Sequence, residues 1–329
     1  MTNLSGKQVL VTGAGGFIGS HLTELLVREG AAVRVLCKYN GRGDLGKLSH
    51  LPAEIIDTIE IQTGDIRDPF LVDRLVSGCD IVFHLAALIG IPYSYTAPAD
   101  YVETNVQGTL NVLEACRRHR VDRLLQTSTS EVYGSAVETP MSESHRLHPQ
   151  SPYAASKVAS DALALSYFRS FDTPVVVVRP FNTFGPRQST RAVIPTILRQ
   201  LMNAQELRLG AVTPMRDFTF VTDTAQGFIE LSKSEKALGE TVNLGTGKCI
   251  SIGDIAELCM KVTQQSLPLI CDEERVRPAK SEVDRLQADI QKVQNLCSWA
   301  PQVDLESGLR RTFEDLQQTH ADPRTGYSI

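Results

Sequence analysis

A glycine-rich turn near the start of the 329-residue chain constrains the fold more than any other feature of the sequence. Gly13, Gly16 and Gly19 directly follow the apolar run Gln8–Thr12 and stand at the start of a segment with helical spacing. Glycine allows the backbone to turn tightly, and the N-terminus of the following helix presents free N–H groups to an anion. A strand, a glycine turn and a helix in this order predict a parallel α/β sheet that binds the diphosphate of a dinucleotide.

Short runs rich in Val, Ile and Leu alternate with helical segments as far as Arg179. The expected strands are Gln8–Thr12, Ala32–Cys37, Thr58–Gln62, Ile81–Leu85, Arg123–Thr127 and Pro174–Arg179. The expected helices lie near residues 17–29, 69–77, 98–119 and 152–171. Such alternation requires right-handed crossovers, which place helices on both faces of the sheet. We therefore predict an α/β protein with a Rossmann-type doubly wound parallel sheet.

The alternation loosens in the second half of the chain, because prolines interrupt it and no boundary is sharp. Phe218–Val221, a helix from Thr222 and the run Thr241–Leu244 are expected to return to the sheet. Ser251, with Asp254 close behind it, predicts the capped start of another helix. The expected division is an NAD(P)-binding domain over residues 1–180 with 218–247 returning to it, and a smaller, discontinuous α/β substrate-binding lobe over residues 181–217 and 248–320.

Composition limits the partners and the location. A net charge of −5 argues weakly against nucleic acid, and no stretch approaches the about 18–20 apolar residues of a membrane helix. The first residues lack the basic and apolar parts of a secretory signal. The seven cysteines show no C-x-x-C spacing, which predicts reduced thiols and no metal site. We expect a cytoplasmic protein that binds neither nucleic acid nor membrane.

Two cations follow the second expected strand, where many dinucleotide-binding proteins carry an acid for the adenosine ribose. The charges of Lys38 and Arg42 would suit a 2′-phosphate, which slightly favours NADP over NAD, although both could be solvated loop cations. Asp65 and Ile66 are expected at the adenine. The other expected cofactor contacts come from Phe17, Ile18, Leu85, Ala86, Ala87 and Thr127.

A tyrosine and a lysine one helical turn apart predict acid–base chemistry. Tyr153 and Lys157 share a helix face, so both can contact the cofactor as well as each other. A tyrosine has a pKa of about 10, and a base near neutral pH needs a decrease of about 3 units. An ammonium about 4 Å away at an effective dielectric of about 20 supplies that much, so we expect Lys157 to lower the pKa of Tyr153. The spacing alone also fits a packed tyrosine and a surface lysine, but the glycine turn and the polar triplet Thr129-Ser130-Glu131 favour catalysis.

Several motifs occur together in the chain. They are the glycine turn, Thr129–Gly134, Tyr153-x-x-x-Lys157, Arg179–Pro186 and Arg216–Phe218. With these motifs the chain resembles, over nearly its whole length, the extended short-chain dehydrogenase/reductase family. The resemblance implies NAD(P) in one lobe and a nucleotide-diphosphate sugar in the other. The segments most similar to the nucleotide-diphospho-N-acetylglucosamine 4,6-dehydratases of legionaminic-acid biosynthesis are Ile89–Ser94, Ser151–Tyr153 and Arg187–Pro195.

The resemblance implies a reaction that begins with oxidation of the sugar at C4. Tyr153 would take the proton of the 4-hydroxyl, Thr129 would hydrogen-bond the same oxygen, and Lys157 would hold Tyr153 and the nicotinamide ribose. Glu131 would then remove the C5 proton, and water would leave C6 with a proton from Glu131 or through Ser130. Hydride would return to C6 and give a 4-keto-6-deoxy sugar. Many dehydratases have Asp in place of Ser130, so the acid at C6 stays open.

Residues of the second lobe are expected to bind the nucleotide. The candidates are Asn182, Arg191, Val193, Pro195, Arg216 and Arg277. The guanidinium groups of Arg216 and Arg277 match phosphate oxygens, and Asn182 is expected to donate to the same diphosphate. The segment from Val193 to Pro195 is expected beside the base, whereas Arg191 could also be a surface charge. The sequence distinguishes neither GDP from UDP nor hydroxyl from acetamido at C2.

Three other functions stay open. A UDP-glucuronate decarboxylase shares the oxidation at C4 and a similar triplet, and a 4-epimerase shares the oxidation but has no need of Glu131. A non-catalytic NAD(P)-binding regulator is a more remote alternative, since the triplet and the Tyr–Lys pair are intact. Family resemblance also predicts a homodimer that pairs the helices near 98–119 and 152–171.

Overall fold

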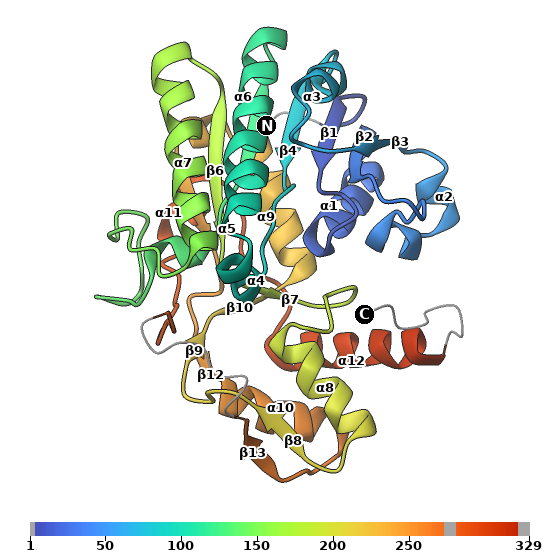
Figure 1. Ribbon diagram of the computed structural model, residues 1–329, viewed down its shortest axis with the longest axis vertical. Helices are drawn as coiled ribbons and strands as arrows, with labels where there is room; N and C mark the ends of the chain where they lie inside the picture. The colour runs from blue at the N-terminus through green and yellow to red at the C-terminus, as the bar shows by residue number, and fades with distance from the viewer. Residues whose placement is uncertain (1–3, 273–280, 322–329) are drawn as a thin grey trace.

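A seven-stranded, fully parallel sheet is the frame of the protein, which the computed structural model describes over residues 4–272 and 281–321 (Figure 1). Its strands are β1 (Gln8–Thr12), β2 (Ala32–Lys38), β3 (Glu60–Gly64), β4 (Ile81–His84), β5 (Arg123–Thr127), β6 (Val175–Pro180) and β11 (Thr241–Leu244). They are ordered β11-β6-β5-β4-β1-β2-β3, so the strand order reverses between β1 and β4. Ligands of such sheets bind beyond the carboxyl ends of the strands at this reversal. The predicted Rossmann-type doubly wound fold is confirmed.

Helices cover both faces of this sheet. On one face α1 (Phe17–Arg28) packs against α9 (Val221–Lys233), and on the other α6 (Gly108–His119) packs between α3 (Pro69–Val76) and α7 (Pro152–Phe171) (Figure 1). The shorter helical segments are η1 (Gly46–His50), α2 (Ala53–Ile56), α4 (Ile91–Thr96), α5 (Pro98–Tyr101), the π-helical η2 (Val102–Gln107), η3 (Ser130–Tyr133) and η4 (Glu235–Ala237). Both faces of the central strands are therefore out of water, as their apolar side chains require, whereas the edge strand β3 stays largely exposed.

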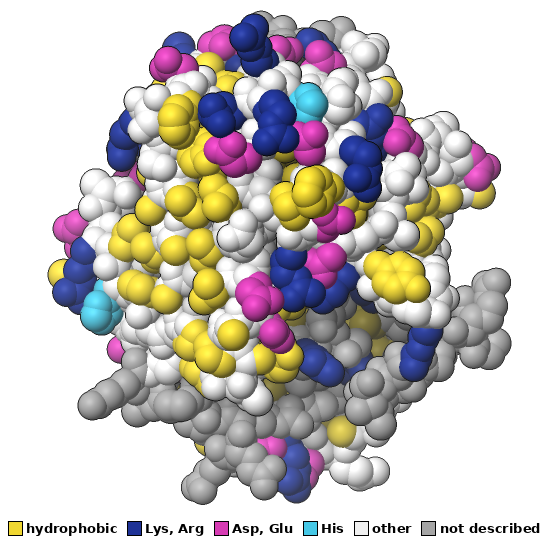
Figure 2. Space-filling model, turned by 45° about the horizontal axis from the view of Figure 1, so that its top comes forward, with side chains coloured by type: hydrophobic (Ala, Val, Ile, Leu, Met, Phe, Trp, Pro, Cys, Tyr) yellow, Lys and Arg dark blue, Asp and Glu magenta, His cyan; other side chains and the backbone are white. Residues whose placement is uncertain are grey.

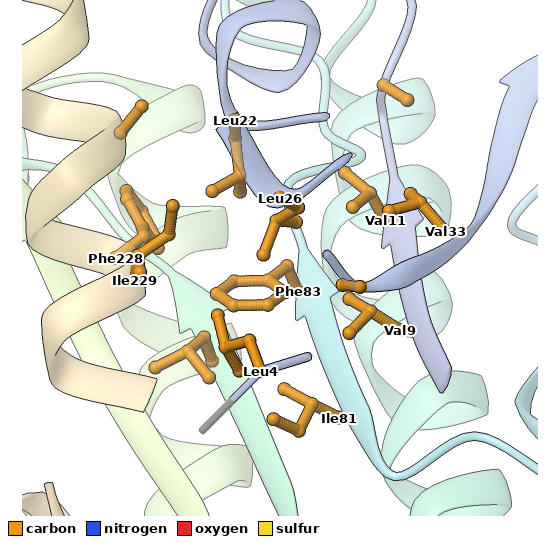
Figure 3. Close-up of a cluster of buried hydrophobic side chains, with 14 of the residues drawn as sticks. Leu4, Val9, Val11, Leu22, Leu26, Val33, Ile81, Phe83, Phe228 and Ile229 are labelled. Atoms are coloured by element: carbon orange, nitrogen blue, oxygen red, sulfur yellow. The ribbon is translucent and has the colours of Figure 1, made fainter. Parts of the chain in front are cut away.

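A hydrophobic core between the sheet and the α1–α9 layer fixes the position of the nucleotide-binding helix (Figure 3). The ring of Phe83 on β4 is fully buried, and it lies among side chains of α1 such as Leu22 and Leu26 and of α9 such as Phe228 (Figure 3). Burial of a side chain of this size stabilises the fold by about 1.5–3 kcal/mol. Because α1 is packed in this way along its length, its N-terminus is held at the carboxyl end of β1.

The smaller lobe is built from three strand pairs and the helices around them (Figure 1). The pairs are β7 (Asn182–Phe184) with β10 (Phe218–Phe220), β8 (Leu207–Leu209) with β13 (Leu269–Cys271), and β9 (Met215–Arg216) with β12 (Ile250–Ser251). The helices are α8 (Val193–Asn203), α10 (Ile252–Thr263) and α12 (Leu305–Ala321), whereas α11 (Gln291–Leu296) packs beside β11 of the large sheet. Side chains of α8, α10 and α12 share one apolar core. The predicted cap of α10 is confirmed, because Ser251 Oγ accepts from the backbone N–H of Asp254 at 3.0 Å.

Most expected elements occur where the sequence places them. β1, β5 and α7 match the expected bounds, whereas β3 begins and ends two positions later than expected. The prediction that Phe218–Val221 rejoins the sheet is wrong: β10 pairs with β7, and β11 takes the edge position beside β6. The division into lobes by residue number stays a prediction. Among the described residues, no helix combines the length and the apolar character needed to span a bilayer.

A partly buried link joins α1 to the chain that follows β7. Arg187 has a left-handed backbone (φ 65°), and its Nη2 donates to Oε2 of Glu24 on α1 at 2.7 Å. The backbone N–H of Arg187 donates to Asp315 of α12 at 3.1 Å, and His21 Nε2 lies 2.9 Å from the carbonyl of Pro186. A left-handed conformation costs a non-glycine residue of the order of 1 kcal/mol, which these contacts offset.

We predict that His21 makes folding stability fall in acid. Burial, and next the charge of Arg187, lower the pKa of His21 from 6.5 to about 4, so on acidification the unfolded chain binds the proton first. Stability present at neutral pH should thus be lost between about pH 6.5 and about pH 4, by up to about 3 kcal/mol for this group. Urea unfolding across this range should show a smaller loss in His21→Gln than in the wild type. Parallel curves for the two proteins would contradict the prediction.

Candidate active site

The glycine turn forms a close-fitting cradle at the reversal of strand order. Gly13 has φ +73°, and a Cβ added there would lie 2.7 Å from the backbone nitrogen of Ala86. A Cβ on Gly19 would lie 2.3 Å from the carbonyl oxygen of Gly13. Gly16 is the N-cap of α1 and offers no side chain to its free N–H groups. The cradle fits the diphosphate of a dinucleotide, because bare backbone and helix N–H groups face the space beyond it.

The other residues expected at the cofactor lie around this cradle. Leu85, Ala86 and Ala87 leave the end of β4, and Ala86 donates its N–H to Thr12 Oγ1 at 3.2 Å. Phe17 and Ile18 form the first turn of α1, and Thr127 ends β5. All of them therefore belong to the same edge of the sheet, at the carboxyl ends of neighbouring strands.

The residues expected at the adenosine end are arranged less simply. Asp65 follows β3, but Nε and Nη2 of Arg67 donate to its carboxylate at 3.0 and 2.8 Å and hold its pKa below the usual range. Ile66 is buried and packs toward Gly108. Lys38, the last residue of β2, and Arg42 in the chain after it are both exposed. Reasoning from the sequence missed Arg67, which stands so close to Asp65 that the pairing could have been proposed.

Tyr153 and Lys157 are buried together in the first turns of α7. Their exposed fractions are 7 % and 4 %. The helix starts where the sequence predicts, because Ser151 Oγ accepts from the N–H of Ala154 at 3.1 Å. Nζ of Lys157 donates to the carbonyl of Thr127 at 2.5 Å. Burial lowers the pKa of Lys157 to about 8, and the carboxylate of Asp161 acts in the opposite direction.

The pKa of Tyr153 differs from the expectation. Burial raises it well above its ordinary value, a hydrogen bond with Thr129 lowers it, and the negative charge of Glu131 raises it further. The prediction that Lys157 brings this pKa down is therefore wrong for the protein groups alone. Spacing along a helix places an ammonium near a phenol but carries no information on how completely the phenol leaves water, and loss of water dominates here.

The polar triplet forms a turn that faces the tyrosine. Thr129 is the N-cap of η3 and accepts from the backbone N–H of Glu131 at 3.2 Å, so the two side chains leave the same tight turn. Ser130 is buried between them, and Glu131 is partly exposed. Because Thr129 hydrogen-bonds Tyr153 and the charge of Glu131 acts on the same phenol, a hydroxyl, a carboxylate and a phenol meet at one centre.

An apolar wall borders this centre. Leu88 and Ile91, from the chain after β4, pack with Tyr101 and Tyr153, whose rings meet edge-on at 6.3 Å between centroids. The side chain of Asn105 fixes this chain, because its Oδ1 accepts from the N–H of Leu88 at 2.8 Å and its Nδ2 donates to the carbonyl of Leu88 at 3.0 Å. Sequence reasoning assigned no role to Asn105 or Tyr101.

A second cavity of about 370 Å³ lies in the smaller lobe. Asn182, Arg191, Val193 and Arg216 line it, as expected of nucleotide-binding residues, whereas Pro195 is buried in α8 and does not line it. Arg277 lies outside the described residues. Oδ1 of Asn182 is buried and has no hydrogen-bond partner among the described residues. The cavity is thus lined by positively charged and polar side chains of the kind that bind a nucleotide diphosphate.

A carboxylate that sequence reasoning missed also lines this cavity. Glu282 accepts from Nη2 of Arg216 at 3.0 Å. An anionic diphosphate can approach Arg216 only beside this carboxylate, whose charge Arg216 offsets. In the sequence there was only a weak indication that Glu282 lies at this site: it follows closely after Arg277, which was expected to bind the diphosphate.

A dinucleotide cradle joined to a Tyr-x-x-x-Lys pair on one parallel sheet defines an extended short-chain dehydrogenase/reductase. More narrowly, the chain belongs to the family described as GDP-mannose 4,6 dehydratase, which matches residues 10–312. This family contains NAD-dependent nucleotide-sugar dehydratases, decarboxylases and epimerases, and the expected resemblance is confirmed.

Similar proteins act in different ways on their sugars. The UDP-N-acetyl-alpha-D-glucosaminuronate decarboxylase of Bacillus cytotoxicus is 31 % identical over 96 % of this chain and 99 % of its own length. The structure of the dTDP-glucose 4,6-dehydratase DesIV from Streptomyces venezuelae, with NAD bound, has 30 % identity and a TM-score of 0.82 over 94 % of this chain and 97 % of its own. The UDP-N-acetylglucosamine 4-epimerase of Methanobrevibacter ruminantium M1, in complex with UDP-N-acetylmuramic acid, has 28 % identity and a TM-score of 0.86 over 95 % and 99 %.

We predict that activity falls on the alkaline side as Lys157 loses its proton. Its pKa is lowered from 10.5 to about 8, so the ammonium form is present below about pH 8 and is lost above it. The value of kcat/KM, which reports ionisations of the free enzyme, should therefore decline above about pH 8. In Lys157→Arg the residual activity should lack this decline, because a guanidinium stays charged. A wild-type kcat/KM that stays constant well above this pH would refute the prediction that activity depends on the ammonium form of Lys157.

Proposed function

We propose that the protein is a nucleotide-sugar 4,6-dehydratase that converts a nucleotide-diphosphate hexose into its 4-keto-6-deoxy form. The observation that carries this proposal is the common turn of Thr129 and Glu131: Thr129 hydrogen-bonds the phenol of Tyr153, and the negative charge of Glu131 acts on it. Apart from a hydride acceptor, oxidation at C4 requires only the phenol and the hydroxyl. A carboxylate at the same centre is what elimination of water across C5 and C6 additionally needs.

Each residue of the centre has a role in this proposal. Tyr153 removes the proton of the 4-hydroxyl while Thr129 hydrogen-bonds the same oxygen. Because burial raises the pKa of Tyr153, this step requires the positive charges of Lys157 and of a bound, oxidised nicotinamide beside the phenol. A bound nicotinamide dinucleotide supplies the acceptor and later the donor of the hydride. Glu131 removes the proton from C5, which the new 4-ketone has made acidic. Glu131, directly or through Ser130, passes this proton to the hydroxyl that leaves C6 as water. After the hydride has returned to C6, the proton that Tyr153 took from the 4-hydroxyl reaches Glu131 through water, and Glu131 delivers it to C5.

The surroundings of the centre favour a neutral C6 over a carboxylate. Leu88 and Ile91 make the wall beside Tyr153 apolar. In a uronic acid C6 is a carboxylate, and its loss of water against this wall would oppose binding. This argument supports dehydration over the decarboxylation that the Bacillus cytotoxicus relative performs. A 4-epimerase is the other alternative. It is less favoured than a dehydratase, because it would leave Glu131 without a role.

The substrate in this proposal is GDP- or UDP-N-acetylglucosamine, on the resemblance of the sequence motifs. Asn182, Arg216 and Arg277 would bind its diphosphate, and Arg191 and the start of α8 from Val193 to Pro195 would lie near its base. Oδ1 of Asn182, buried without a partner among the described residues, and the guanidinium of Arg216 support a polar ligand in this cavity.

We predict that Glu131→Gln separates cofactor binding from dehydration. The amide keeps the size of the side chain but cannot take the C5 proton, so formation of the 4-keto-6-deoxy product should fall at least about a hundredfold. Mass spectrometry of wild-type and variant reactions with GDP- and UDP-N-acetylglucosamine would follow the loss of water, and fluorescence titration would follow the cofactor. Glu138→Gln, an exposed carboxylate on the chain beyond the same turn, is the matched control. Dehydration by Glu131→Gln near the wild-type rate would rule out the role, and loss of carbon dioxide by the wild type would identify a decarboxylase.

For the cofactor we propose NADP over NAD, although the DesIV structure contains NAD. Lys38, the last residue of β2, and Arg42 in the chain after it are exposed and can approach a 2′-phosphate. We predict a higher kcat/KM with NADP in the wild type. Lys38→Ala should lower this value about tenfold for NADP, in line with the loss of one charge-assisted hydrogen bond, and leave it unchanged for NAD. Steady-state kinetics with each cofactor after its removal and replacement would measure this, and a wild-type preference for NAD would exclude it.

We also propose a homodimer in the cytoplasm. The surface of α6, α7 and the segment before them carries exposed apolar side chains, among them Val102 and Phe171, which are 56 % and 52 % exposed. Figure 2 shows hydrophobic side chains gathered in patches on one face of the molecule, with few charges between them. Burial of such surface against a second copy would stabilise a dimer. All seven cysteines are free thiols, as expected in a reducing compartment.

A further inference from the structure

The catalytic turn is held at its start by a buried carboxylate. Ser128, which directly precedes Thr129, donates its Oγ–H to Oδ2 of Asp161 at 2.8 Å. The backbone N–H of Ser128 also donates to the carbonyl of Val178 at 2.7 Å, so main chain and side chain are both fixed. Asp161 is 2 % exposed on α7, one turn beyond Lys157, whose charge it supports. The start of the turn and the lysine therefore share one carboxylate.

The end of the same turn is held by a buried arginine. The guanidinium of Arg179 on β6 lies over the ring of Tyr133, 4.9 Å from its centroid, and Nη1 donates to the hydroxyl of Tyr133 at 3.0 Å. That hydroxyl in turn donates to Oδ1 of Asn243 on β11 at 2.7 Å. Burial raises the pKa of Tyr133 to about 12, so the phenol keeps the proton that it donates.

Both anchors meet in one ion pair. Nε and Nη2 of Arg179 donate to Oδ2 of Asp161 at 3.1 and 3.0 Å, and both side chains are almost completely out of water. A charge at such depth is strongly bound to its partner, because the surroundings screen little and an unpaired charge is costly. The pair therefore has little freedom to move. It also ties the turn to α7, which carries Tyr153 and Lys157.

We propose that the Asp161–Arg179 pair is the positioning element of the catalytic turn and holds Glu131 at a fixed place relative to Tyr153. Neither member of the pair touches the reacting atoms, so both act through the hydroxyl anchors at the two ends of the turn. The inference rests on the proposed function, because Glu131 must reach C5 only after Tyr153 has acted. A displacement of about 1 Å in such a group costs about a hundredfold in rate.

The test removes one anchor at a time and leaves the ion pair in place. Ser128→Ala and Tyr133→Phe each delete one hydroxyl, and the ring of Tyr133 stays beneath Arg179. We expect kcat for dehydration to fall about tenfold in each variant, while KM for the nucleotide-sugar changes less than about twofold. Stopped-flow absorbance should show a larger share of reduced cofactor during turnover than in the wild type. Oxidation at C4 would continue, whereas removal of the C5 proton by Glu131 would be slower.

Matched substitutions elsewhere control for loss of a buried hydroxyl. Ser232 on α9 is buried and donates its Oγ–H to the carbonyl of Ile229 at 2.7 Å, and the hydroxyl of Tyr167 on α7 donates to Glu114. Ser232→Ala and Tyr167→Phe should keep kcat and the share of reduced cofactor at wild-type values. Thermal unfolding of all four variants shows how much of any change follows from stability.

Two results would overturn the positioning role. One is kcat in Ser128→Ala and Tyr133→Phe equal to that of the control variants. The other is a decrease in kcat that follows thermal stability, with no increase in reduced cofactor, since a purely structural role gives that result. Failure of the proposed function is seen separately, in the wild type alone, as absence of a product that has lost water. With an active wild type, the variants therefore test the positioning role by itself.

Discussion

The chemistry proposed for this protein depends on a lysine ammonium held almost completely out of water. Burial favours the neutral amine, and it brings the pKa of Lys157 down to about 8. Two features of the fold keep the charged form accessible at neutral pH: the carbonyl of Thr127 at the end of β5, and the carboxylate of Asp161 on the next turn of α7. Both exist because parallel strands end at the same edge of the sheet and α7 begins there. Tyr153 and the turn that carries Glu131 are arranged around this charge.

Those parts of the fold that depend on local signals could be predicted from the sequence. β1 and α7 lie at the expected residues, because an apolar run, a glycine turn and a capping serine each act over a few neighbours. β10 could not be predicted in the same way. Its alternatives were a place in the large sheet or a pairing with β7, and only the position of β11 beside β6 decides between them. Long-range pairing of this kind leaves little trace in a single sequence.

The candidate site, like the fold, could be predicted from the sequence only in part. Spacing and motif predicted that Thr129, Glu131 and Tyr153 lie together. In the structure Thr129 and Glu131 share one turn and Thr129 hydrogen-bonds Tyr153, while their catalytic roles stay predictions. The predicted decrease in the pKa of Tyr153 was wrong. Spacing indicates which groups are neighbours but not how far burial removes them from water. Asp161 was missed although it follows Lys157 by one helical turn. A carboxylate at this spacing is more often a solvated surface group, and only its burial reveals the pairing with Arg179.

The link between α1 and the chain after β7 has a consequence for how the two lobes work together. The N-terminus of α1 faces the dinucleotide cradle, and Glu24 farther along the same helix binds Arg187, whose neighbour Gln188 lines the second cavity. A shift of this helix along its axis would therefore displace one wall of the other cavity. A rigid-body opening of one lobe away from the other would therefore first have to break this partly buried ion pair.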